Sequence, residues 1–206
     1  MMKPVTLSLA LALMTVPVAP VWAQEPAAAA TPVQAEAAGK FVDRLANRAF
    51  GILRDDSLSR DDARTQFRAL LRENFNLDEA GLRLIRRHRA SLTPQQLSAY
   101  RAALPDFLVN TYSDRLYDYA DSQVRVIRTA PRGTRGDVDV FSSVSDPKGG
   151  KPIDAIWTVK ANGPKPLIQN LTVNGVNISL TQEADFNAYI EKNGFDALVN
   201  FMRQAK

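Results

Sequence analysis

Few residues in this chain have the types and spacing that catalysis or metal binding requires. There is no cysteine and one histidine, His88, so the sequence lacks the paired spacing of a metal site and the nucleophile of thiol chemistry. Ser145 and Lys148 match the S-x-x-K string of serine acyl enzymes, but they lie in a Pro-Lys-Gly-Gly turn and not at a helix start. Asp137 and Asp139 alternate as the solvent face of a strand does. The sequence therefore predicts no catalytic residue, no metal ligand and no cofactor.

Basic residues gather at one place, the end of a helix expected over residues 78–89. The members of this arginine cluster are Arg83, Arg86, Arg87 and Arg89. Cations at a helix C-terminus complement the helix dipole, and runs of charge are usually solvated, which is the simpler interpretation. The functional alternative is a docking patch for an acidic partner or a phosphate head group. The formal net charge of +4 is spread along the chain and gives little reason to expect nucleic acid as a partner.

The elements that must position these residues fall into three groups. Helical spacing of apolar residues extends from residue 36 to about 128, and strand alternation extends from 123 to 180, with a hairpin signal at Asn174-Gly175. Helical spacing returns from Thr181, and Gly194 separates two short helices. Because the helices precede the strands and do not alternate with them, the pattern predicts an α+β fold. It would have N-terminal helices, an antiparallel sheet of about four strands and two C-terminal helices.

The N-terminus has the features of an export signal. Lys3 precedes an apolar core over residues 7–18, and Val21-Trp22-Ala23 is a small-x-small cleavage site. The apolar run is shorter than the about 20 residues that span a bilayer. Residues 24–38 are mostly Ala, Pro and Gln, typical of a disordered tether. We therefore expect a signal peptide over 1–23, cleaved after Ala23, a tether over 24–38, and one domain over 39–206.

Three blocks of sequence, taken in order, are more specific than composition. They are F-x-x-L…F over residues 67–75, the helix start L-T-P-Q-Q over 92–96 running on to the tyrosines of 112–119, and the Gly-Val turn at 175–176 followed by F-x-x-Y-I at 186–190 and G-F-D-x-L at 194–198. This order resembles the MlaC (toluene-tolerance) family of periplasmic phospholipid carriers over most of residues 38–203. The chain departs from the family pattern at Pro166, near the position of the family's Trp, at Asn170, the position of its Asp, and at Ala184-Asp185, which replace an arginine–serine pair.

The resemblance implies a curved sheet packed against helices, with an apolar cavity for acyl chains between them and the lipid head group in solvent. It implies a soluble, monomeric periplasmic carrier that moves glycerophospholipid between an outer-membrane lipoprotein complex and an inner-membrane ABC transporter, maintaining outer-membrane lipid asymmetry. Amphipathic helices and one sheet face supply a large apolar surface for this. The residues expected to contact lipid are Phe67, Leu70, Leu71, Leu108, Tyr112, Leu116, Val138, Val140, Val173 and Phe186.

Three alternatives stay open at this point. The departures at Pro166 and Asn170 affect the expected pocket rim, so another lipid such as a hopanoid is one of them. A small α+β enzyme with a hydrophobic substrate is the second, and it would use Tyr112 or Tyr119 as oxyanion donor and Asp118 as base. A lipid-free interaction module or chaperone is the third, and it would have a fully packed interior. An apolar cavity, and the groups on its wall, distinguish a carrier from the second and third of these, whereas the identity of the lipid needs mass spectrometry of the bound material.

Overall fold

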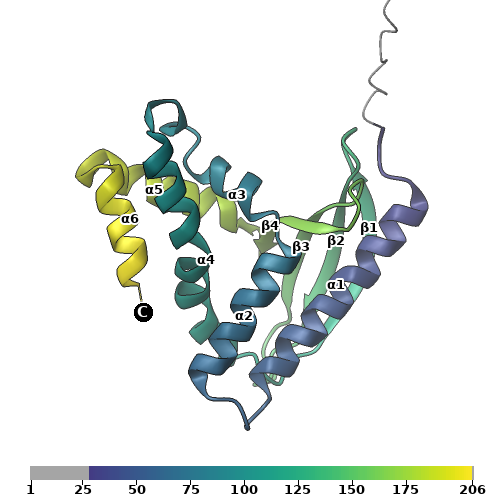
Figure 1. The fold of residues 1–206 in the computed structure, drawn as a ribbon. Coiled ribbons are helices and arrows are strands. Elements are labelled where there is room, and N and C mark those ends of the chain that lie inside the picture. The colour runs from purple at the N-terminus through teal and green to yellow at the C-terminus, as the bar shows by residue number, and fades with distance from the viewer. Residues whose placement is uncertain (1–27, 206) are drawn as a thin grey trace, which may run out of the picture.

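The computed structural model describes residues 28–205, apart from the side chains of residues 113–115. The expected signal peptide over 1–23 and its cleavage site lie outside the described residues. The elements are, in order, α1 (Pro32–Leu53), α2 (Arg60–Asn74), α3 (Leu77–Leu84), the 3₁₀ helix η1 (Arg89–Ser91), α4 (Pro94–Tyr117), β1 (Val124–Arg132), β2 (Asp137–Val144), β3 (Ile153–Lys160), β4 (Leu167–Val173), β5 (Val176–Asn177), α5 (Ile178–Asn193) and α6 (Phe195–Gln204). Helices, then strands, then helices make the expected α+β fold (Figure 1).

The strands form one open antiparallel sheet in the order β1-β2-β3-β4-β5 (Figure 1). Its register is interrupted in β1 between Val126 and Arg128, and opposite Thr158 and Val159 of β3. Such bulges bend a strand and increase its twist, which fits a curved sheet. The expected sheet of about four strands is confirmed, and the two-residue β5 is added to it.

The second strand of the last hairpin is shorter than the sequence pattern predicted. Alternation extended to Leu180, whereas β5 ends at Asn177 and α5 begins at Ile178. The cause is a side-chain cap, since the Leu180 amide donates to Asn177 Oδ1 at 3.0 Å. The turn itself was predicted correctly, and both Asn174 and Gly175 adopt positive φ there.

The segment expected to be a disordered tether needs a correction, because it is helical from Pro32 onward. Thr31 and Gln34 form a capping box, in which the Gln34 amide donates to Thr31 Oγ1 and the Thr31 amide donates to Gln34 Oε1. Ala35 and Ala38 are then buried in the core. Alanine and glutamine are good helix formers, so the composition that suggested disorder also permits this helix. Residues 24–27 lie outside the described part.

Two hydrophobic clusters hold the fold together, and α4 contributes to both. The first lies between the sheet, α1 and α2, and includes Val109 of α4. The second joins α3, the first half of α4, α5 and α6 around the fully buried Tyr100. Figure 1 shows α1 lying across the sheet, and α4, α5 and α6 on the side of α2 that is away from α1. Within residues 28–205, no helix combines the length and apolarity needed to cross a bilayer.

Candidate functional site

An apolar cavity of about 430 Å³ lies between the two clusters. Helical side chains from α1 to α4 form one side of its wall, and β3, β4 and the start of α5 form the other. Its apolar lining includes Leu45, Phe50, Leu53, Phe67, Leu70, Leu71, Phe75, Leu84, Leu104, Leu108, Ala155, Trp157, Leu171, Val173 and Ile178. None of the described lining residues carries a charge. The interior is therefore not fully packed, and it suits a long apolar ligand.

Seven of the residues expected to contact lipid line this cavity: Phe67, Leu70, Leu71, Leu108, Tyr112, Leu116 and Val173. They come from α2, α4 and β4, whose spacing put each set on one inward face. The structure brings them together, while their contact with lipid stays a prediction.

The other three expected contacts do not line the cavity, which corrects their assignment to its wall. Val138 and Val140 are fully buried in the first cluster with residues of α1. Phe186 packs in the second cluster, with its ring centroid 6.3 Å from that of Tyr100 and 5.5 Å from that of Phe107. Their inward orientation was predicted correctly, but neighbouring helices cover them.

Several lining residues were missed by sequence reasoning. Trp157 lines the cavity, and its indole N–H donates to Ser142 Oγ at 2.9 Å. Its alternation with Ala155 and Val159 gave the face but not the empty space beside it. Ile178 and Ser179 were missed because the pattern placed the chain up to Leu180 in a strand. Gln182 lies in the helix that was expected from Thr181, and it was missed because the apolar spacing used to find inward faces does not select a polar residue. The residue that could have indicated the start of this helix is Asn177, which caps α5.

The cavity opens at one end of the sheet. Leu116, with 38% of its surface exposed, is the most exposed of the described lining residues. The strand ends beside it share one edge, because Val124 pairs with Val144 and Val144 pairs with Ile153. All three line the cavity and are only partly buried. The mouth therefore lies between these strand ends, the C-terminus of α4 and the start of α5.

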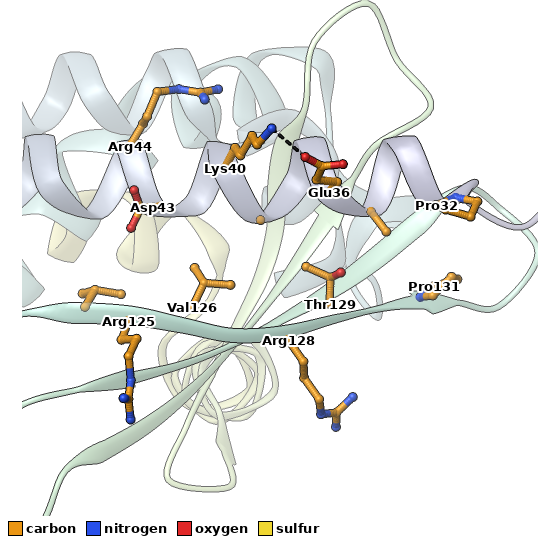
Figure 2. A pocket seen from close by; sticks show the side chains of 13 residues that line it. Pro32, Glu36, Lys40, Asp43, Arg44, Arg125, Val126, Arg128, Thr129 and Pro131 are labelled. Carbon is orange, nitrogen blue, oxygen red and sulfur yellow. Dashed lines mark ion pairs between the residues drawn. The ribbon is translucent and has the colours of Figure 1, made fainter.

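A second concavity runs between α1 and the edge strand β1 (Figure 2). It is larger, about 820 Å³, but it is an open groove with charged walls. Glu36 and Lys40, one turn apart on α1, form an ion pair of 2.6 Å on one wall of the groove, and the hydrogen bond from Lys40 lowers the pKa of Glu36. Val126 and Thr129 point toward α1, whereas Arg125 and Arg128 point away. An open charged groove does not suit an acyl chain, so the apolar cavity is the candidate site.

In the arginine cluster, two side chains make polar contacts to other elements, and two are open, meaning that they are exposed and have no ion pair with a described residue. Arg83 donates to the Gln169 carbonyl oxygen at 2.7 Å, and Arg86 pairs with Glu183 at 2.6 Å. These two tie α3 and the turn after it to β4 and α5. Arg87 and Arg89 are exposed and form no ion pair with the residues that the structure describes. Arg86 is also exposed, so the two pairs differ in their polar partners and not simply in their exposure.

The enzyme alternative finds little support on the cavity wall. Tyr112 and Tyr119 do line it, but Asp118 is exposed and is absent from the described lining. No carboxylate or histidine belongs to that described lining, so none of its residues could act as a base beside a tyrosine. Nor does any group of three His, Cys, Asp or Glu side chains within residues 28–205 have the arrangement of a metal site.

Comparison with known proteins agrees with the geometry. A solved structure of a phospholipid-binding protein from Ralstonia solanacearum, in complex with a phospholipid, superposes with a TM-score of 0.68. The two sequences are 19% identical, and the match covers 82% of this chain and 96% of that one, which shows a shared fold. The family model described as MlaC protein matches residues 43–204. The chain therefore belongs to the MlaC family.

Proposed function

We propose that this protein is a periplasmic carrier that holds a glycerophospholipid by its acyl chains inside the apolar cavity. The observation that carries the proposal is an uncharged cavity with an open mouth, in a member of the MlaC family. The phospholipid bound to the Ralstonia solanacearum protein of the same fold supports the choice of ligand. The export signal expected over residues 1–23 from the sequence pattern supports the choice of compartment.

Energetics explain why such a carrier would need docking partners. Burying acyl carbons contributes about 0.8 kcal/mol per CH₂, so two chains of roughly 15 carbons gain on the order of 20 kcal/mol before costs. Affinity of this order makes release into water too slow to be useful. The lipid would instead pass from mouth to channel between this carrier and its partners. We assign these as an outer-membrane lipoprotein complex and an inner-membrane ABC transporter, which supplies the energy, so that the cycle maintains outer-membrane lipid asymmetry.

Mass spectrometry of lipids extracted from the natively purified protein tests the proposal. We expect glycerophospholipid near one molecule per protein. A hopanoid in its place would support the alternative cargo, and the absence of any lipid would contradict the carrier function and favour an interaction module.

A matched pair of variants on α4 makes the test site-specific. Leu108→Trp places a larger side chain on the cavity wall, whereas Leu97→Trp makes the same change at a partly buried residue of the second cluster. We expect Leu108→Trp to lower the bound lipid and Leu97→Trp to leave it unchanged in the folded fraction. Equal loading of both variants would contradict binding in the cavity.

A further inference from the structure

A pair of hydrogen-bonded polar side chains joins α4 to α5 on the cavity wall, which is mostly apolar but also includes Tyr119, Gln169, Asn170 and Ser179. The Tyr112 hydroxyl donates to Gln182 Oε1 at 3.0 Å, and both residues line the cavity. Gln182 is only 7% exposed, so its amide group lies in the cavity wall and not in solvent. Buried polar groups are normally hydrogen-bonded, so a polar side chain in a mostly apolar wall indicates a ligand with a group that can hydrogen-bond to it.

The pair lies one helical turn inside the mouth. Tyr112 precedes the exposed Leu116 by four residues on α4, and Gln182 follows Ile178, the first residue of α5, by four. Residues four apart lie on the same face of a helix, about 6 Å apart along its axis. In a phospholipid, the ester groups of the glycerol come between the head group and the acyl chains. A lipid with its chains in the cavity and its head group in solvent would place those esters at this depth.

The chemistry of the pair suits a neutral acceptor. A glutamine amide has two N–H donors, and no described residue is within hydrogen-bonding geometry to accept from Gln182 Nε2. Whichever way the amide is turned, the pair keeps a free N–H donor after its internal hydrogen bond. Taking a phosphate anion to this depth would cost its hydration without a cation to pair with, because the described wall carries no charge. An ester carbonyl oxygen is a neutral acceptor and avoids that cost.

We infer that Tyr112 and Gln182 form an ester-binding subsite, which sets the depth of the lipid by hydrogen bonding to a glycerol ester carbonyl. This inference rests on the proposed function. Such a subsite would make the carrier selective for ester-linked lipids. It would not discriminate between head groups, because it contacts the lipid deeper in the cavity than the phosphate.

Competition between two synthetic lipids tests the subsite. Delipidated protein is mixed with equal amounts of dipalmitoyl phosphatidylethanolamine and its dihexadecyl ether analogue, which lacks both carbonyl oxygens, and the bound ratio is read by native mass spectrometry. We expect the wild-type protein to favour the ester lipid by about three- to tenfold, the effect of one net hydrogen bond. Equal binding of the two lipids would overturn the subsite but leave the carrier function intact. Binding of neither would contradict the carrier function itself.

Variants assign the preference to the pair. Gln182→Leu keeps the side-chain size and should bind both lipids equally, and Tyr112→Phe should lose part of the preference. Gln66→Leu makes the same substitution as the first variant on the exposed surface of α2 and should keep the wild-type ratio. Circular dichroism confirms that each variant is folded before its ratio is read. A preference that persists in Gln182→Leu, or disappears in Gln66→Leu, would overturn the assignment.

Discussion

The Tyr100 hydroxyl donates a 2.9 Å hydrogen bond to the Gly81 carbonyl oxygen, joining α4 to α3 inside the second cluster. Tyr100 is fully buried, and its burial raises the pKa of the hydroxyl, which therefore stays a donor. The approach is close, because a Cβ on Gly81 would lie 2.7 Å from Leu104 Cδ2. Since Gly81 also lines the cavity, this contact fixes the α3 side of its wall.

Removing the Tyr100 hydroxyl should weaken this joint. Tyr100→Phe leaves the Gly81 carbonyl oxygen buried without its side-chain donor, and we expect the free energy of unfolding to fall by about 1–3 kcal/mol. Urea unfolding followed by circular dichroism measures it. Tyr189→Phe removes a hydroxyl from a partly buried ring that stacks on Phe201, and we expect a change within about 0.5 kcal/mol. Equal losses in both variants would contradict a specific role for the Tyr100 bond.

The pH dependence of stability should carry a contribution from Asp137. Partial burial raises the pKa of its carboxyl group, against the opposing effects of Arg135, Lys160 and Arg132. The folded state therefore holds this proton more tightly than the unfolded chain, so the contribution of Asp137 to stability falls as pH rises from its usual pKa through the raised one. Asp137→Asn removes the charge and should raise the melting temperature at neutral pH.

That gain should shrink as the pH falls toward about 4, because the wild-type carboxyl becomes protonated there. Melting curves recorded across this range measure it. Asp56→Asn, at an exposed site before α2, controls for the loss of one carboxylate. A gain from Asp137→Asn that is independent of pH, or one that Asp56→Asn reproduces, would contradict the burial argument.

If the arginine cluster docks onto a partner, reversing its charges should slow lipid transfer in a way that depends on salt concentration. Arg87 and Arg89 are its two open side chains, so Arg87→Glu with Arg89→Glu should slow lipid transfer to membranes containing the partner transporter without changing bound lipid. Higher ionic strength should reduce the difference from wild type, because surface charges are screened. Fluorescent lipid transfer at two salt concentrations measures both effects.

The control for this experiment reverses the same amount of charge elsewhere. Arg125 and Arg128 are exposed and point away from α1 on the other face of β1 (Figure 2). If reversing these two charges slows transfer equally, net charge alone explains the effect, and the arginine cluster is not a docking site.

The sequence predicted the faces of the elements well and the cavity less well, for a physical reason. The spacing of Phe67, Leu70 and Leu71 depends only on the helical period, so their inward position could be derived. Val140 and Val173 are also inward on their strands, yet one is covered and the other faces the cavity. That difference depends on where α1 crosses the sheet, which neither alternation nor periodicity specifies.

The predicted boundaries of elements were wrong where the hydrogen bond of a single side chain determines the boundary. The capping box of Thr31 begins α1 inside a segment whose composition suggested disorder, and the cap from Asn177 ends β5 inside an alternating pattern. In both places a local hydrogen bond outweighed the average signal of the surrounding residues. The second misplacement hid Ile178 and Ser179, which line the cavity at the start of α5.

A charge at the mouth should block loading. Leu116→Asp puts a carboxylate at the most exposed part of the lining, where it would be desolvated by entering acyl chains. We expect at least a severalfold loss of co-purified lipid with helix content unchanged, measured by lipid extraction and circular dichroism. Ile127→Asp, at an exposed residue of β1, is the matched control and should load normally. Loss of lipid together with loss of fold would mark Leu116 as core.

Removing the lipid should lower the stability of the fold. A ligand that binds only the folded state stabilises it by RT ln(1 + [L]/Kd), which is about 2.7 kcal/mol when the free ligand is at a hundred times Kd. Acyl chains in the cavity also restore packing contacts that an empty apolar space lacks. Delipidated protein should therefore melt at a lower temperature than the protein as purified, and dipalmitoyl phosphatidylethanolamine should restore the difference.

The Leu108→Trp variant separates ligand binding from nonspecific effects of detergent or lipid on melting. Its cavity is partly filled by the protein itself, so delipidation should change its melting temperature less than that of the wild type. If the wild-type protein melts at the same temperature before and after delipidation and responds to no lipid added, the interior holds no stabilising ligand. The carrier function would then be wrong, whatever the family relationship.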